Sequence, residues 1–217
     1  PTLAAVVWVL RREIRALLFG PERRLLLPLI LATVVTGALG YPLDKAFEGR
    51  GGNLAFLGAM LCVTGGIQLL TERLKPQPKE GPWTWDRGIA VGIAQSLSAI
   101  PGLSRLGMTT CAGMLCGRAR VHAVAFSFLC ALPVTAGKTL LECREALAGG
   151  EVDFWTRRML YGAYPLGALI AFILGVLTFR WLLQRLARGT LVPFGIYCLL
   201  LGGLTLICSP MQTKMPP

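Results

Sequence analysis

The sequence predicts an all-α integral membrane protein with about six transmembrane helices and one re-entrant helical hairpin. The 217 residues have a mean hydropathy of +0.61, with 54% hydrophobic and only 15% charged residues, a composition that excludes an ordinary soluble domain. Uncharged apolar stretches recur at about the 20-residue length that a membrane-spanning helix needs. Two shorter apolar runs flank a hinge that contains proline and glycine. We therefore expect a single polytopic membrane domain over residues 1–217.

The spanning helices follow from the apolar stretches in order along the chain. The chain starts with Pro1 and is uncharged up to Arg11, which is typical of the second half of a spanning helix. We therefore expect the chain to be a fragment whose first helix begins upstream. Four charge-free stretches supply four further crossings. A fifth stretch is slightly short, and Lys138 extends it because a lysine side chain can reach the membrane surface with its charged end. The expected helices cover residues 1–19, 25–43, 52–73, 121–142, 159–184 and 191–208.

The basic residues predict the orientation in the membrane. The formal net charge is +11, but its distribution favours membrane topology over binding to nucleic acid. Fourteen of the 22 Lys and Arg residues fall in one set of alternating loops and seven in the other, and Arg105 is the remaining one. By the positive-inside rule, the richer loops are cytoplasmic and the C-terminus lies outside.

Residues 88–120 predict the re-entrant hairpin. The apolar runs at 88–100 and 108–117 are each too short to span a bilayer. Between them lie a proline, two glycines and Arg105, which are costly in lipid unless they line a cavity within the protein. We expect a hairpin that enters from the cytoplasm and carries Ser104 and Arg105 at its tip.

The hinge has the chemistry of an anion site. The first amides of the helix after the hinge, its dipole and the Arg105 guanidinium converge on one place, and Ser104 and Thr109 add hydroxyl groups. A cytoplasmic loop between two tilted helices, with Arg105 as a topology charge, remains an alternative interpretation. A generic structural membrane subunit is a further one, which the buried pair of Ser104 and Arg105 makes less attractive.

The hinge also resembles the PGxSRSxxT signature of the bacterial undecaprenyl-pyrophosphate phosphatases, the bacitracin-resistance family. The matching residues run Pro101-Gly102-Leu103-Ser104-Arg105-Leu106-Gly107-Met108-Thr109. Downstream, Arg120 and the stretch Phe126-Ser127-Phe128-Leu129-Cys130-Ala131-Leu132-Pro133 are similar to the family's arginine and its FSFLLAIP-like sequence. The similarity in the order of elements extends over essentially the whole chain.

The resemblance implies an enzyme of the bacterial inner membrane that removes the terminal phosphate of undecaprenyl pyrophosphate. This reaction recycles the carrier lipid of cell-wall synthesis and confers resistance to bacitracin. Ser104, Arg105 and Thr109 are the implied catalytic residues. We also expect substrate contacts from residues that precede or form the hinge, namely Gln95, Pro101, Gly102 and Gly107.

Two departures from the family pattern limit this expectation. Leu106 replaces the second serine of the signature. The family's other half-site, an E/QxxxE helix with a PxSSxGH-like turn, is expected upstream of Pro1 as the inverted repeat of the hairpin. Any divalent cation would have its ligands in that part, and residues 1–217 alone are expected to be inactive. The alternative function is a membrane protein that binds or translocates a polyprenyl phosphate without hydrolysis.

The predicted orientation can be tested by cysteine labelling in a background without the seven native cysteines. Cysteine at Gly52 should react with a membrane-impermeant thiol reagent added outside the cell, because the positive-inside rule places its loop there. Cysteine at Gln77 should react only after permeabilisation. The reversed pattern would refute the orientation.

Overall fold

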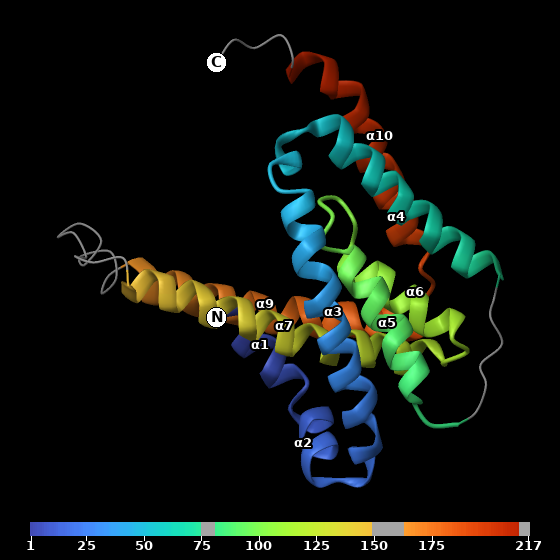
Figure 1. Ribbon diagram of the computed structural model, residues 1–217, viewed down its shortest axis with the longest axis vertical. Coiled ribbons are helices and arrows are strands. Elements are labelled where there is room, and N and C mark those ends of the chain that lie inside the picture. The colour runs from blue at the N-terminus through green and yellow to red at the C-terminus, as the bar shows by residue number, and fades with distance from the viewer. Residues whose placement is uncertain (75–80, 149–162, 213–217) are drawn as a thin grey trace.

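The computed structural model describes residues 1–74, 81–148 and 163–212. Figure 1 shows the described chain as an assembly of helices in which α7, α9 and α1 form one group and α3, α4, α5, α6 and α10 a second. Within these residues there are nine α-helices: α1 Thr2–Val9, α2 Arg11–Phe19, α3 Leu26–Ala46, α4 Leu54–Leu74, α5 Trp85–Leu97, α6 Arg105–Leu115, α7 Arg120–Ala148, α9 Ala163–Arg188 and α10 Val192–Gln212. Short 3-10 turns at Pro21–Leu25 and Arg50–Gly52 flank α3 and α4.

Five of these helices are long and apolar enough to cross a membrane. They are α3, α4, α7, α9 and α10, so five of the predicted crossings appear as single helices, although 159–162 lies outside the described residues. The sixth differs, because residues 1–19 form two short helices with a break at Leu10, whose ψ of 13° departs from helical geometry. Four charged residues among the nine of α2 make that half of the segment unsuited to lipid.

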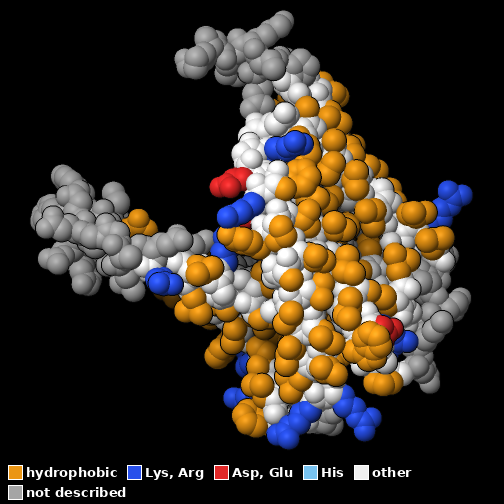
Figure 2. All heavy atoms as spheres, viewed as in Figure 1, with side chains coloured by type: hydrophobic (Ala, Val, Ile, Leu, Met, Phe, Trp, Pro, Cys, Tyr) orange, Lys and Arg blue, Asp and Glu red, His pale blue; other side chains and the backbone are white. Residues whose placement is uncertain are grey.

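Apolar side chains cover much of the outer surface of the spanning helices. Figure 2 shows hydrophobic side chains over the visible faces of α3, α4 and α10, with basic side chains gathered near the turn between α2 and α3. In α9 none of the residues in the 18-residue apolar window is fully buried. A surface of this kind is what a membrane protein presents to lipid.

α4 and α10 cross with their backbones in contact at glycines. A Cβ atom at Gly65 would lie 2.7 Å from the carbonyl oxygen of Gly195, and one at Gly202 would lie 2.7 Å from that of Gly58. The two helices run in opposite directions, since the N-terminal glycine of each faces the C-terminal glycine of the other. Small residues let the two backbones approach this closely, and the resulting van der Waals contact holds helices together in lipid.

α3 and α5 form a second close crossing, here with the helices parallel. A Cβ atom at Gly88 would lie 2.5 Å from the Pro28 carbonyl oxygen, and one at Gly92 would lie 2.8 Å from that of Ala32. The Thr36 hydroxyl lies 2.7 Å from the Ala32 carbonyl and 3.2 Å from the Gly92 carbonyl, so it bonds across the two helices. This crossing anchors the first arm of the predicted hairpin on α3.

One carboxylate joins three helices. Arg120, at the start of α7, donates from one Nη to both carboxylate oxygens of Glu72 in α4, at 2.8 and 2.9 Å. The backbone amide of Leu191, just before α10, donates to the same carboxylate at 3.0 Å. Both charged side chains are mostly shielded from solvent, with 20% and 16% exposure, which makes the pairing stronger than at an open surface.

The glycine crossing between α4 and α10 yields a test with an internal control. Gly65→Ala should lower the free energy of unfolding by about 1–3 kcal/mol, because the new methyl group forces the two backbones apart. Gly66→Ala is the matched control, since nothing lies within 4 Å of its Cβ position. Thermal unfolding in detergent measures both variants, and equal stability would show that the crossing is not tight.

Candidate active site

The predicted hinge joins two short helices that lie side by side (Figure 1). α5 has 13 residues and α6 has 11. At 1.5 Å per residue they are about 20 and 17 Å long, against the roughly 30 Å of a bilayer core. The structure therefore forms a helical hairpin over the predicted residues, with residues 98–104 as its turn, and its re-entry from the cytoplasmic side stays a prediction.

The turn is held against α4. Gly102 has φ +95°, a conformation that suits glycine, and a Cβ atom there would lie 2.7 Å from the carbonyl oxygen of Leu57. The Thr64 hydroxyl oxygen accepts a hydrogen bond from the Ser104 amide at 3.2 Å and lies 3.5 Å from the Gly102 carbonyl oxygen. A single threonine of α4 thus fixes both sides of the turn.

Ser104 is the N-cap of α6. Its hydroxyl oxygen accepts a hydrogen bond from the Gly107 amide at 3.3 Å, while its carbonyl accepts the first helical bond, from Met108. The capping bond uses a lone pair and leaves the hydroxyl proton free to donate. The amides of Arg105 and Leu106 have no acceptor within the helix, as in any first turn.

Arg105 begins α6 and Thr109 lies one turn later. The Arg105 side chain is exposed and Ser104 is half-buried, so the expectation of a buried pair was wrong. The Arg105 Nε lies 3.4 Å from the Ser98 hydroxyl at the end of the first arm. Thr109 is buried and donates to the Arg105 carbonyl at 2.8 Å, and its hydroxyl also contacts that of Ser127 in α7. The hydroxyl pair ties α6 to α7 directly beneath the arginine.

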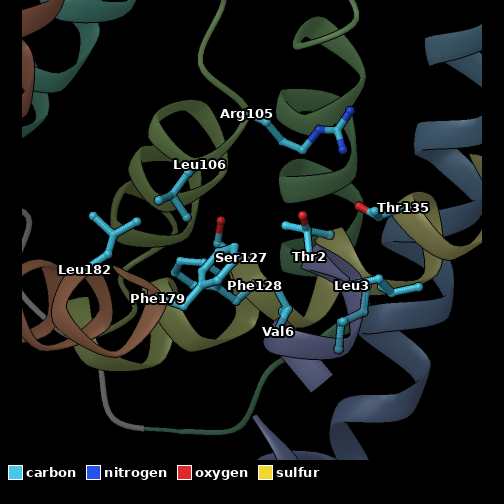
Figure 3. Close-up of a pocket in the computed structure, with 12 residues that line it drawn as sticks. Thr2, Leu3, Val6, Arg105, Leu106, Ser127, Phe128, Thr135, Phe179 and Leu182 are labelled. Atoms are coloured by element: carbon cyan, nitrogen blue, oxygen red, sulfur yellow. The ribbon is translucent and has the colours of Figure 1, made fainter. Parts of the chain in front are cut away.

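Next to Arg105 is a cavity of about 230 Å³ between α1, α6, α7 and α9. Figure 3 shows the Arg105 side chain reaching over this space, with the hydroxyls of Ser127 and Thr2 directed toward the same region. The remaining lining is mostly apolar and consists of Leu3, Val6, Leu106, Phe128, Ala131, Leu132, Thr135, Phe179 and Leu182. The cavity therefore combines one cationic group, the Arg105 guanidinium, and a few hydroxyl groups with walls of apolar side chains.

The structure brings together only part of the predicted site. Arg105 lines the cavity itself, whereas Ser104 and Thr109 are not part of the lining; Thr109 contacts the lining residue Ser127, and Ser104 caps the helix that Arg105 begins. Leu106, which replaces the family serine, contributes an apolar side chain to the wall.

The expected substrate-binding residues lie apart from the cavity lining. Gln95 is 2% exposed, and its amide nitrogen donates to the Cys130 carbonyl of α7 at 3.1 Å. Pro101 and Gly102 shape the turn on α4, and a Cβ atom at Gly107 would collide with the Gln68 side-chain amide. The structure shows how these residues pack and bond within the protein, and their contact with substrate stays a prediction.

Sequence reasoning did not single out Ser127 and Thr135 as parts of the site. Ser127 lies in the stretch that carries the second resemblance, so its hydroxyl at an otherwise apolar position was a usable signal. Thr135 lies two residues after the end of that stretch, and no local pattern marks it. Both reach the cavity because α7 passes beside the start of α6.

The Gln-x-x-x-Glu spacing also occurs in α4, at Gln68 and Glu72. Gln68 is 3% exposed and packs beside Gly107 of the hairpin, and its Oε1 has no partner among the described residues. Glu72 instead bonds Arg120 and the Leu191 amide. This pair supports the hairpin and does not line the cavity. Across 1–74, 81–148 and 163–212, no group of three His, Cys, Asp or Glu side chains gathers as metal ligands.

The fold defines a multi-pass membrane protein whose candidate site sets one arginine beside a mostly apolar cavity. The model of the bacitracin resistance protein BacA family matches residues 1–204, and the chain belongs to this family. A curated undecaprenyl-diphosphatase of Syntrophotalea carbinolica is 36% identical over 214 residues, covering 94% of this chain and 78% of that protein. An undecaprenyl-diphosphatase of Halothermothrix orenii is 31% identical over 211 residues, covering 96% and 80%. The resemblance stated from the hinge is therefore confirmed.

The capping role of Ser104 can be separated from a chemical role by two substitutions. Ser104→Ala should cost about 1 kcal/mol of stability, because the Gly107 amide loses its acceptor. Ser104→Asn should restore most of that loss, since asparagine caps equally well. Thermal unfolding checks the pair, and an equal loss in both variants would argue against the cap.

Proposed function

We propose that this protein is an undecaprenyl-diphosphatase that binds the diphosphate of undecaprenyl pyrophosphate at Arg105 and takes part in removing its terminal phosphate. The observation that carries the proposal is the Arg105 guanidinium above an apolar cavity with hydroxyl groups at its rim. The names of the relatives support the same substrate. The products are undecaprenyl phosphate and inorganic phosphate.

The chemistry at the tip of the hairpin is the binding of anionic oxygens. Arg105 donates two parallel hydrogen bonds to a phosphate and stays charged when desolvated. The free amides at the start of α6 add donors aligned with the helix dipole, and Ser104 donates its hydroxyl proton. Thr109 bonds the backbone carbonyl of Arg105 and the Ser127 hydroxyl, and so holds the first turn of α6 against α7. These donors stabilise charge that builds on the phosphate oxygens as the anhydride bond breaks.

The apolar walls suit the isoprenoid tail. Leu106, Phe128 and Phe179 line the cavity below the arginine, and their side chains offer no competing polar contacts. The lipid then enters sideways from the membrane while its head group remains at the tip. In the proposed orientation the site opens to the outer side of the bacterial inner membrane, where release of the carrier lipid supports cell-wall synthesis and bacitracin resistance.

A second candidate function is binding or translocation of a polyprenyl phosphate without hydrolysis. The observation in its favour is that no carboxylate or histidine is among the described residues that line the cavity. Hydrolysis needs a group that moves a proton. We propose that such groups come from an E/QxxxE helix and a PxSSxGH-like turn upstream of Pro1, as expected from the family resemblance.

Complementation distinguishes these two functions. Residues 1–217 alone should release no phosphate from undecaprenyl pyrophosphate above a control without protein. A segment encoding the acidic motif and the histidine turn, fused before Pro1 or supplied in trans, should restore release if two hairpins form one site. Phosphate release by residues 1–217 alone, lost in Ser104→Ala, would mean that one hairpin carries complete chemistry. Binding without release in the fused protein would favour translocation.

Arg105→Lys tests the arginine in the fused protein. A point charge cannot reproduce the two parallel bonds, so turnover should fall about tenfold to a hundredfold while the protein still inserts and accumulates. Arg87→Lys is the control, because Arg87 lies on the same hairpin and its guanidinium bonds the Pro82 carbonyl. Turnover near that of the unmodified protein would leave Arg105 as a topology charge.

A further inference from the structure

A second cavity, of about 240 Å³, lies where α2, the 3-10 turn Pro21–Leu25 and the first part of α7 meet the chain just before α5. It sits at the end of the helices that the charge count predicts to be cytoplasmic. The lining combines charged and apolar side chains: Glu13, Arg24, Leu25, Pro82, Trp83, Arg118, His122, Ala125, Phe126 and Leu129. None of these residues lines the Arg105 cavity.

The charges that line this cavity are mainly positive. Arg24 and Arg118 contribute two guanidinium groups, and Glu13 contributes one carboxylate. With His122 neutral, the lining therefore carries a net charge of +1. Within the described chain, no ion pair joins Glu13 to either arginine. The cavity thus keeps cationic donors that the protein does not neutralise internally.

Arg118 is held in place as a donor. Its guanidinium stacks over the Trp83 ring, 5.4 Å from the centroid, and one Nη donates to the Gly81 carbonyl. Trp83 is 7% exposed and stacks on Phe126, with centroids 3.9 Å apart and an angle of 17°. The rings fix the guanidinium plane, so little side-chain entropy remains to be lost when a ligand binds.

One donor of Arg118 is unused. Its Nε is buried and has no hydrogen-bond partner among the described residues. Desolvation, together with the nearby charge of Arg87, lowers the pKa of Arg118 from its ordinary value. A desolvated cation with a free donor is stabilised by an anion that accepts from it.

We propose that this cavity binds the phosphodiester head group of an anionic phospholipid, with Arg24 and Arg118 as the donors to phosphate. The net charge of the lining matches a monoanion, and the Glu13 carboxylate disfavours a more highly charged phosphate. Its oxygen without a described partner can accept from a head-group hydroxyl such as those of glycerol. Basic pockets at the ends of spanning helices bind lipid head groups in this way.

A lipid fits better than a free phosphate ion because of the apolar part of the lining. Leu25, Phe126 and Leu129 form a wall that a small inorganic ion would not contact. The spanning segments Arg23–Ala46 and Arg120–Leu141 begin at the cavity, so it lies at the level of the head groups. The glycerol backbone and the first acyl carbons then rest against this wall.

The two cavities use opposite faces of α7. Ser127 and Phe128 line the Arg105 cavity, whereas Phe126 and Leu129 line the second one. The lipid site is therefore independent of the proposed hydrolysis, and its occupancy can be measured without any assay of activity.

Native mass spectrometry of the purified chain in a mild detergent tests the proposal. Phosphatidylglycerol, phosphatidylcholine and inorganic phosphate are titrated separately, and the Kd of the first bound molecule is read for each. Arg118→Gln and Arg24→Gln should each weaken phosphatidylglycerol binding about tenfold or more, since each removes a charged hydrogen bond. Arg23→Gln is the matched control, because Arg23 is the chain neighbour of Arg24 and lies outside the cavity lining, and it should leave the Kd unchanged.

Phosphatidylcholine should bind more weakly than phosphatidylglycerol, and its Kd should not respond to the variants. Arg24 is exposed and makes no fold-critical contact in the described chain, so its variant remains informative if Arg118→Gln does not fold. If Arg24→Gln and Arg118→Gln bind phosphatidylglycerol with the same Kd as the matched control, the proposed site is refuted. If inorganic phosphate displaces phosphatidylglycerol at comparable concentration, the cavity binds a free ion and the proposal of a lipid ligand is refuted.

Discussion

The carboxylate of Glu72 is the point on which the arrangement of the helices depends. It accepts from Arg120 and from the Leu191 amide, and so joins α4, α7 and α10 at one end of the assembly. α4 then supports the hinge through Thr64, and α7 supplies a wall to each of two cavities. Removing this charge would leave Arg120 without its counter-ion in a mostly shielded position, which is costly in a low-dielectric setting.

The hairpin is specified by the same rule that governs the spanning helices. Backbone amides and carbonyls need partners away from water, so an irregular turn persists only where protein groups satisfy it. Thr64 does this for the Ser104 amide, and Ser104 does it for Gly107. The donors left over, at Arg105 and the first amides of α6, are the ones that an anion can use.

Much of the architecture could be predicted because length and apolarity decide which segments cross a membrane. Five long helices and the two short arms of the hairpin follow from that rule. The break at Leu10 was not predictable, since Leu10 is buried in a core cluster with residues far along the chain, among them Leu129 and Leu191. The buried bond from Gln95 to the Cys130 carbonyl, and the cavity positions of Ser127 and Thr135, depend on which face of α7 meets the hairpin. The periodicity of apolar residues in one sequence does not show which face of a helix meets a given neighbouring helix.

The crossing of α4 and α10 has a consequence for biosynthesis. The Leu191 amide and Glu72 are separated by 119 positions along the chain. While the ribosome is still making α10, the glycine surface of α4 has no α10 backbone against it, and the Glu72 carboxylate lacks the Leu191 amide. α10 therefore completes the packing of α4 late in synthesis, and a chain stopped before α10 leaves this glycine surface uncovered and prone to aggregation.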